Sequence, residues 1–212
     1  MRRPDQEDLV RELLAARVRD PRVLQAFREV PRAGFVPSDL IEQAYLDVPL
    51  PIPHGQVTTQ PSLVARMIEA LGLTGVEQVL EIGTGYGFQS ALLSLFSRIV
   101  WTIERWPDIA ATATANFARR GITNVEVVVG DGTEGLPEHA PFDAILVAAA
   151  FPRVPLPLVD QLSPGGRLVQ PIGAGGDEEV VLFEKVPQGL RRRGTVTLAH
   201  FVRLYGKHGF PG

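Results

Sequence analysis

The chain contains no cysteine, which excludes disulfide bonds, thiolate catalysis and cysteine-rich metal sites. Its histidines also lack metal-ligand spacing, so no metal is expected. The formal net charge of −3 gives no reason to expect binding to nucleic acid or to an anionic membrane. No apolar run approaches the roughly 20 residues of a membrane helix, and residues 1–8 lack the apolar core of a signal peptide. These absences predict a cytoplasmic protein.

The composition is that of an ordinary globular protein. The 212 residues, 45% hydrophobic and 21% charged, suit a single domain with a substantial core. Hydrophobic residues at helical spacing predict a helix over about 9–18, and Asp20-Pro21 predicts the start of a short second helix. Repeated prolines between residues 30 and 61 exclude long helices and central strands. We expect an ordered loop region there, packed on a sheet.

From Pro61 onward, helical and strand patterns alternate along the chain. Strands are expected at 78–82, 99–104, 125–129, 142–148 and 167–171, and helices at 61–71, 88–97, 107–120 and 155–162. Such alternation predicts an α/β fold with a mostly parallel, doubly wound sheet.

Two further strand patterns close the sequence. Residues 179–185 and 190–201 flank a turn and predict an antiparallel hairpin, which gives a seven-stranded sheet. The sequence does not predict the order of the last two strands within that sheet. We expect one domain over 1–212. Residues 1–60 would form N-terminal helices and a substrate-side loop, and 61–212 a Rossmann-like cofactor-binding core.

A glycine-rich turn follows the first predicted strand. Gly83, Gly85 and Gly87 come directly after Glu81-Ile82. A dinucleotide fingerprint would need its third glycine at Phe88. The spacing E-x-G-x-G-x-G instead resembles the S-adenosylmethionine loop of class I methyltransferases. The loop backbone, with Thr84, would contact the amino-acid tail of that ligand, and Glu81 would balance positive charge; a structural turn without a ligand is the alternative.

Two acidic residues end the next two predicted strands. Glu104, followed by Arg105, is placed to accept hydrogen bonds from both ribose hydroxyls. Asp131, followed by Gly132, is placed to accept from the adenine amino group. The alternative for Glu104 is a solvated carboxylate at a strand end, and the alternative for Asp131 is a plain turn. Together with the glycine loop they predict binding of S-adenosylmethionine, with S-adenosylhomocysteine as product.

Several segments resemble the protein-L-isoaspartate O-methyltransferase family over roughly residues 22–206. The most specific segments precede the glycine loop. The matching residues are Val30–Pro37, Ala44-Tyr45, Pro49–Gln56, Thr59-Gln60-Pro61, Leu80–Gln89 apart from Tyr86, Thr102–Arg105, Val129–Gly132, Gly135–Pro137 and Pro164–Val169.

The resemblance implies a class I methyltransferase fold and methyl transfer to the free α-carboxylate of isoaspartyl residues in damaged proteins. The ester would close to a succinimide, and hydrolysis would regenerate some aspartate. A carboxylate, with a pKa of about 4, is already a nucleophile at neutral pH, so alignment matters more than acid–base catalysis. Isoaspartyl proteins and peptides are the expected partners, and a monomer is the expected state.

The resemblance also places the substrate residues. The family pattern Thr-Ile-Ser-Gln-Pro corresponds here to Val57–Pro61, so Thr59 falls on the serine that donates a hydrogen bond near the reacting carboxylate. His54, Gln56 and Thr58 join it as expected substrate-binding residues. An N-cap or turn hydroxyl is the alternative for Thr59. Further departures from the family are Tyr86 and Arg203.

Other functions stay open at this point. The Thr58-Thr59 pair leaves room for a relative that methylates another carboxylate, such as aspartate in a dedicated peptide. A nicotinamide-dependent oxidoreductase is disfavoured by Phe88 and by the Gly130–Gly132 turn. A protein that binds the cofactor without catalysis would have the same fold.

Overall fold

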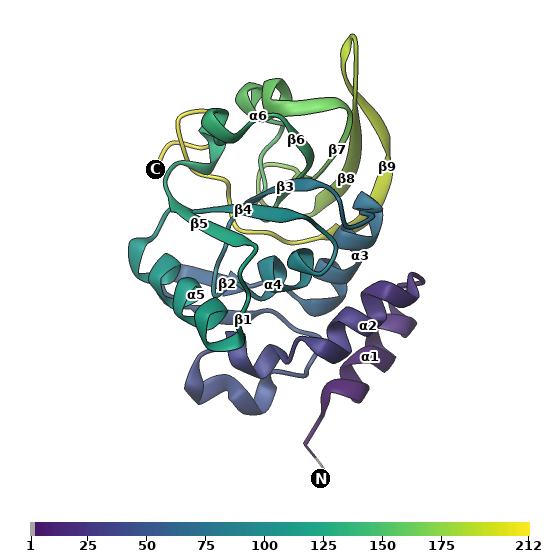
Figure 1. Cartoon of the computed structure of the whole chain (residues 1–212), viewed down its shortest axis with the longest axis vertical. Helices are drawn as coiled ribbons and strands as arrows, with labels where there is room; N and C mark the ends of the chain where they lie inside the picture. The colour runs from purple at the N-terminus through teal and green to yellow at the C-terminus, as the bar shows by residue number, and fades with distance from the viewer. Residues whose placement is uncertain (1–2) are drawn as a thin grey trace.

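A seven-stranded sheet forms the centre of the computed structural model, which describes residues 3–212 (Figure 1). The strand order is β5-β4-β3-β6-β7-β8-β9. Neighbours from β5 through β7 are parallel, whereas β7–β8 and β8–β9 are antiparallel. The strands are β3 (Gln78–Ile82), β4 (Ile99–Glu104), β5 (Val125–Val129), β6 (Phe142–Val147), β7 (Leu162–Ile172), β8 (Glu178–Val186) and β9 (Gly189–Ala199). The predicted fold class is confirmed, and the last two strands follow in chain order to the sheet edge.

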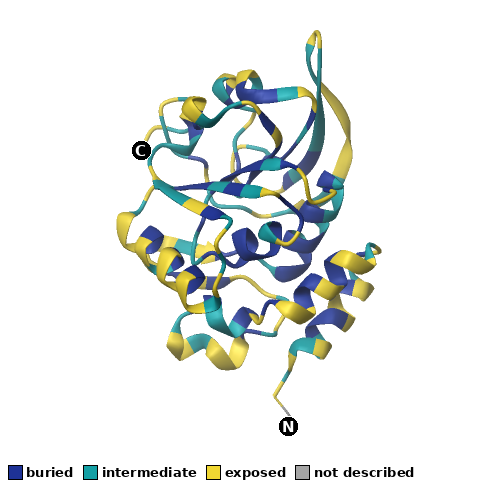
Figure 2. Ribbon diagram, in the orientation of Figure 1, coloured by how far each residue is buried: buried dark blue, intermediate teal, exposed yellow. Residues whose placement is uncertain are grey.

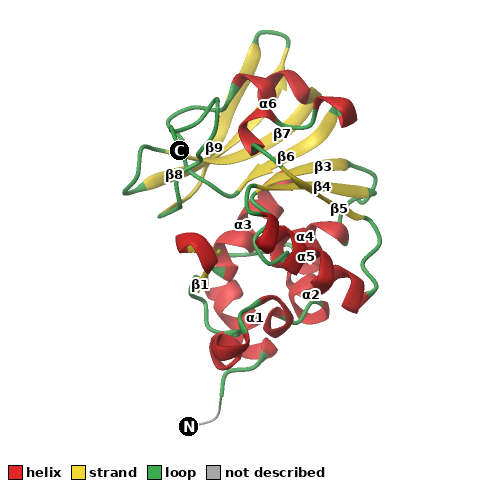
Figure 3. Cartoon of the chain, turned by 90° about the vertical axis from the view of Figure 1, so that its left-hand side faces the viewer, coloured by secondary structure: helices red, strands yellow, loops and turns green. Residues whose placement is uncertain are grey.

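Helices cover both faces of this sheet. Helices α3, α4 and α5 lie on one face with α1 and α2 beyond them, and α6 lies on the other (Figure 3). The α-helices are α1 (Gln6–Ala15), α2 (Pro21–Glu29), α3 (Pro61–Leu71), α4 (Phe88–Ser94), α5 (Pro107–Arg120) and α6 (Leu156–Gln161). Strand β3 is buried on both faces, with Val79 in one core and Leu80 and Ile82 in the other. Figure 2 shows the same contrast between buried strands and the half-exposed outer helices.

The proline-rich region forms ordered short elements. They are the 3₁₀ turns η1 (Arg32–Phe35), η2 (Ser38–Gln43) and η3 (Pro53–Gly55), and the two-stranded antiparallel sheet of β1 (Leu50–Ile52) and β2 (Gln56–Thr58). Two further 3₁₀ turns, η4 (Gly132–Glu134) and η5 (Pro137–His139), lie between β5 and β6. The expected absence of long helices and central strands in residues 30–61 is confirmed.

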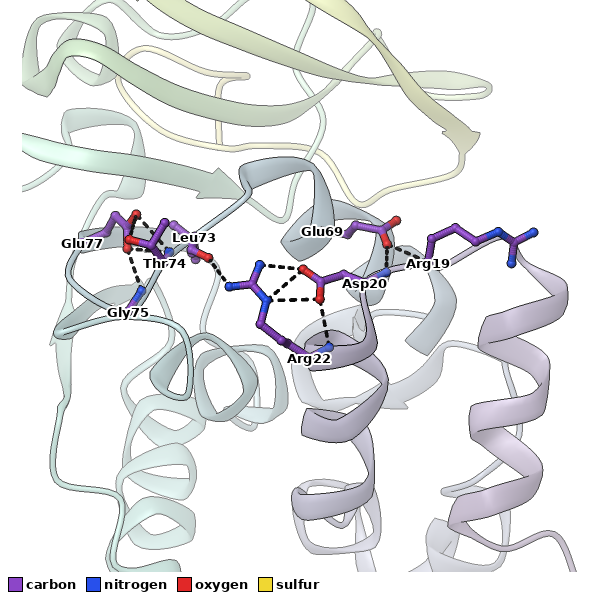
Figure 4. A network of polar contacts seen from close by, with 8 residues as sticks. All are labelled: Arg19, Asp20, Arg22, Glu69, Leu73, Thr74, Gly75 and Glu77. Carbon is purple, nitrogen blue, oxygen red and sulfur yellow. Dashed lines mark hydrogen bonds and ion pairs between the residues drawn. The ribbon is translucent and has the colours of Figure 1, made fainter.

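A polar network attaches the N-terminal helices to the core (Figure 4). Glu69 of α3 accepts from the backbone N–H groups of Arg19 and Asp20, at 2.6 and 2.5 Å. Arg22 pairs with Asp20 and donates to the carbonyl of Leu73 at 3.0 Å. The start of α2 is therefore anchored to the C-terminal end of α3 and to the loop that follows it.

Some predicted boundaries are wrong. Helix α4 ends at Ser94 rather than 97, because the side chain of Asn124 donates to the carbonyls of Ser94 and Ser97. Strand β7 begins at Leu162 and runs through residues 164–166, which looked like a turn; a register shift beside β6 accommodates them. Among the described helices, none is long and apolar enough to span a membrane.

Candidate active site

A cleft opens at the carboxyl ends of β3, β4 and β6. The space free of protein atoms in it is about 900 Å³, counting the part open to solvent. Its lining comes from the β1–β2 region (Ile52 and residues 56–59), Val64, the glycine loop (82–86, Phe88 and Gln89), Ile103–Arg105, Gly132, Ala148-Ala149 and Val202–Tyr205. This is the edge at which an open α/β sheet binds ligands.

The glycine loop reaches the cleft in a backbone conformation that favours glycine. Gly83, Gly85 and Gly87 have φ values of 97°, 54° and 92°. Gly83 and Gly85 line the cleft, so a ligand can approach their backbone closely. Gly87 does not line it. A Cβ at that position would lie 2.5 Å from the ring of Phe117, so packing against α5 requires glycine there.

Glu104 lies at the end of β4 with its carboxylate toward the loop. One oxygen accepts from the N–H of Gly85 at 2.9 Å and the other from the N–H of Trp106 at 3.2 Å. Burial raises its pKa, although these backbone donors favour the ionised form. Since each carboxylate oxygen has a second acceptor site, both remain able to accept from vicinal hydroxyls. Glu104 and the adjoining Arg105 both line the cleft.

Glu81 lies beneath the glycine loop and is not among the residues that line the cleft. Its carboxylate accepts from Gln89 at 2.9 Å, from Thr102 at 2.7 Å and from Ser90. Because the single hydroxyl proton of Thr102 goes to Glu81, the hydroxyl of Thr84 donates to Thr102, at 2.7 Å. Glu81 thus supports the loop through Thr84 and the start of α4.

The titration of Glu81 should be visible in the stability of the fold. Burial raises the pKa of Glu81 from 4.5 to about 7. Because the folded pKa is the higher one, protonated Glu81 contributes fully to the free energy of unfolding below pH 4.5. This contribution decreases as the pH rises from 4.5 and is lost above about pH 7. Glu81→Gln should remove this decrease. Urea unfolding of both proteins at several pH values between 4.5 and 7 measures it; parallel curves would contradict the assignment.

Asp131 lies just beyond β5, and its oxygens are engaged by the C-terminal segment. One oxygen accepts from the N–H and hydroxyl of Thr133, at 2.8 and 2.7 Å, and the other from the N–H of Lys207 at 2.7 Å. These donors hold the pKa of Asp131 low despite partial burial. A Cβ on Gly206 would lie 2.1 Å from this carboxylate, so the close approach requires glycine. Asp131 does not line the cleft, although Gly132 does.

The substrate-side residues are divided between the cleft and its rim. Thr59, Thr58 and Gln56 line the cleft. His54 lies outside it, stacked on Trp106 with ring centroids 3.9 Å apart and bonded to Asp108 at 2.9 Å. The hydrogen bond from His54 lowers the pKa of Asp108. His54 therefore ties the β1–β2 region to the start of α5.

With this geometry in view, comparison with known proteins identifies the family. The family model of protein-L-isoaspartate(D-aspartate) O-methyltransferase matches residues 4–209. The chain belongs to this family. The protein-L-isoaspartate O-methyltransferase of Methanoculleus marisnigri is 47% identical over 99% of this chain and 96% of its own length.

Solved structures agree with the protein-L-isoaspartate O-methyltransferase assignment. One protein of that name superposes with a TM-score of 0.85 at 32% identity, over 96% of this chain and 67% of its own. A Plasmodium falciparum protein described as a member, in complex with S-adenosyl-L-homocysteine, gives 0.78 at 23% identity, over 95% and 98% of the two chains. At that identity, the second likeness shows the shared fold.

Sequence reasoning missed one wall of the methyltransferase cleft. Val202, Leu204 and Tyr205 line it, together with Arg203. The N–H of Leu204 donates to the carbonyl of Ala150, and the N–H of Ala150 donates to the carbonyl of Val202, both at 2.8 Å. The N–H of Phe210 donates to the carbonyl of Leu204 at 2.8 Å. The aromatic residues Tyr205 and Phe210 just after the last strand could have indicated this wall. Their spacing has neither helix nor strand periodicity, so the pattern did not predict it. Tyr86 and Arg203, which depart from the family pattern, both face the cleft.

Proposed function

We propose that this protein transfers a methyl group from S-adenosylmethionine to the free α-carboxylate of L-isoaspartyl residues in proteins and peptides. The ester then closes to a succinimide with loss of methanol, and hydrolysis of that ring regenerates some aspartate. Family membership supports the activity, and one observation supports the site: the glycine loop, Glu104 and Thr59 line one cleft. S-adenosylhomocysteine is the second product.

The residues present fit this cofactor. Glu104 offers two acceptor oxygens for the ribose hydroxyls, and the turn of Gly83 and Gly85 admits the amino-acid tail. Apolar side chains such as Ile82 and Ile103 flank these polar groups, which suits the apolar faces of an adenine ring. When bound, the cofactor supplies an activated methyl group. Arg105 and Gly132 complete the proposed set of cofactor-binding residues. Glu81, Gly87 and Asp131 stabilise the loops that carry this set.

The acceptor needs positioning rather than activation. Its carboxylate is ionised at neutral pH and requires no general base. We assign Thr59 the role of donating its hydroxyl proton to a hydrogen bond with that carboxylate, which fixes one oxygen for attack on the methyl carbon. Binding of both partners in the cleft displaces water from around the reacting groups. In this arrangement residues 1–60 supply the acceptor side and residues 61–212 the cofactor side. A cytoplasmic location and a monomeric state stay predictions from the sequence.

The activity is tested with paired synthetic peptides that are identical except for isoaspartate or aspartate. Labelled methyl from S-adenosylmethionine should reach the isoaspartyl peptide alone. Methylation of the aspartyl peptide would favour the alternative of a different carboxylate acceptor. Methylation of neither peptide, with calorimetry still showing cofactor binding, would overturn the proposed function.

Thr59 is tested by three substitutions in the same assay. Thr59→Ala and Thr59→Val should each lower kcat about 10-fold or more, because a hydrogen bond to a charged group contributes roughly 1.5–3 kcal/mol. Thr59→Ser should retain activity, and the Kd for S-adenosylmethionine should stay the same in all three. A Thr59→Val variant as active as the Thr59→Ser variant would show that the hydroxyl has no part in the reaction.

A further inference from the structure

Arg32 is a buried cation that forms no ion pair, although the Asp47 carboxylate is close enough to favour its charged form. Its side chain is 0% exposed, and within residues 3–212 no carboxylate oxygen lies within the 4.0 Å of an ion pair. Its guanidinium donates instead to neutral oxygens. Nη1 donates to the carbonyls of Ala44 and Leu46 (3.2 and 3.0 Å), and Nη2 to the carbonyl of Val48, the hydroxyl of Thr58 and the carbonyl of Thr59 (2.9, 2.9 and 3.3 Å).

These acceptors belong to two segments, residues 44–48 and residues 58–59. The chain between them forms the β1–β2 sheet, so Arg32 contacts the residues at both ends of that sheet segment. The second segment contributes Thr58 and Thr59 to the cleft. Arg32 itself does not line the cleft, and any effect on the reaction must pass through the residues it holds.

A second contact fixes the same two segments. Asp47 accepts from the N–H of Ser62 and from the side chain of Gln60, both at 2.8 Å. The carbonyl of Thr59 is thus held by Arg32, while Asp47 holds the side chain of Gln60 and the N–H of Ser62 just after it. Thr59 lines the cleft, and its hydroxyl makes no hydrogen bond to the protein among the described contacts.

The energetics favour a geometric role for Arg32. Burial lowers its pKa to about 10, which leaves it protonated at neutral pH. A buried charge that forms no ion pair carries a desolvation cost, and apolar replacements of buried charges are often neutral or stabilising. What an apolar side chain cannot provide is a planar fork of donors that holds two chain segments in one geometry.

We propose that Arg32 is a positioning residue for methyl transfer, acting by holding the backbone of Thr59 and the hydroxyl of Thr58. The inference rests on the proposed function, since it concerns the same cleft. In the family pattern stated above the position of Thr58 is isoleucine, which has no hydroxyl. The Arg32–Thr58 contact is therefore a property of this chain, where it adds an acceptor next to the residue that meets the substrate.

The test separates turnover from cofactor binding. Lysine keeps the charge but not the fork, so Arg32→Lys should lower kcat for the isoaspartyl peptide about 10-fold. Thr58→Val removes one acceptor and should lower kcat about threefold to tenfold, with Thr58→Ser restoring it. The Kd for S-adenosylmethionine, measured by calorimetry, should change less than about twofold in each. If Arg32→Lys does not fold, the Thr58 pair carries the test.

The control is Arg22→Lys, which alters an arginine bonded to the carbonyl of Leu73 in the Figure 4 network, away from the cleft. It should leave kcat unchanged. Hydrogen exchange of the amides in residues 44–59 should quicken in Arg32→Lys and not in Arg22→Lys. Unchanged kcat in folded Arg32 and Thr58 variants, or unchanged exchange in Arg32→Lys, would overturn the proposal. A wild-type protein that methylates no isoaspartyl peptide would overturn the proposed function instead, and the exchange measurement would still decide the role of Arg32.

Discussion

Replacing Glu104 by glutamine should weaken S-adenosylmethionine binding by about 100-fold or more. The carboxylate now accepts from the N–H groups of Gly85 and Trp106 and keeps acceptor sites for both ribose hydroxyls. The amide loses the charge and turns one acceptor into a donor. Hydrogen bonds to charged groups contribute roughly 1.5–3 kcal/mol each. One ribose hydroxyl loses its acceptor and the other keeps only an uncharged one, which accounts for the size of the effect. Isothermal titration calorimetry measures it directly.

A matched control is available on the neighbouring strand. Glu126 of β5 is exposed, and Glu126→Gln makes the same chemical change away from the cleft. It should leave the Kd unchanged. A Kd for Glu104→Gln within about threefold of wild type, in a protein with the native circular dichroism spectrum, would remove Glu104 from the ribose site.

Gly87→Ala should destabilise the fold by about 2–4 kcal/mol. The backbone has a φ of 92°, and the added Cβ would lie 2.5 Å from Cζ of Phe117 in the core. Strain of this kind and overpacking each cost roughly 1–3 kcal/mol. For a protein of this size the loss corresponds to a decrease in Tm of roughly 5–15 °C, measured by thermal unfolding.

Gly121→Ala separates the two causes. Gly121 also has positive φ, 64°, but a Cβ there would meet nothing within 4 Å. It should therefore cost only the backbone strain, about 1–2 kcal/mol. Equal losses for both variants would show that contact with Phe117 is not what requires glycine at position 87.

The central strands could be predicted closely because their signals are local. The strands at 78–82, 99–104 and 125–129 have the bounds of β3, β4 and β5, since each is an apolar run closed by glycine, proline or an acidic residue. The cleft residues at the ends of those strands followed from topology. Parallel strands bring their carboxyl ends to one edge of the sheet, so Gly83, Glu104 and Gly132 meet there.

What could not be predicted depends on contacts between distant parts of the chain. The role of Glu81 is set by Ser90 and Thr102, which turn its carboxylate toward α4. Asp131 is held by Lys207, which lies far along the chain. Arg32 matched a family segment, yet its function depends on carbonyl groups that no side-chain pattern reveals. In each case the residue type showed that the side chain is polar, but it did not show which groups it hydrogen-bonds.

The wall formed by Val202–Tyr205 has a consequence for biosynthesis. Synthesis proceeds from the N-terminus, so the glycine loop, Glu104 and the whole sheet are made before this wall leaves the ribosome. A nascent chain that ends at Ala199 already contains every strand, but its cleft lacks one side. Cofactor binding should therefore begin late in translation, after the last strand has been made, and a message cut short near its end should yield a folded but inactive protein.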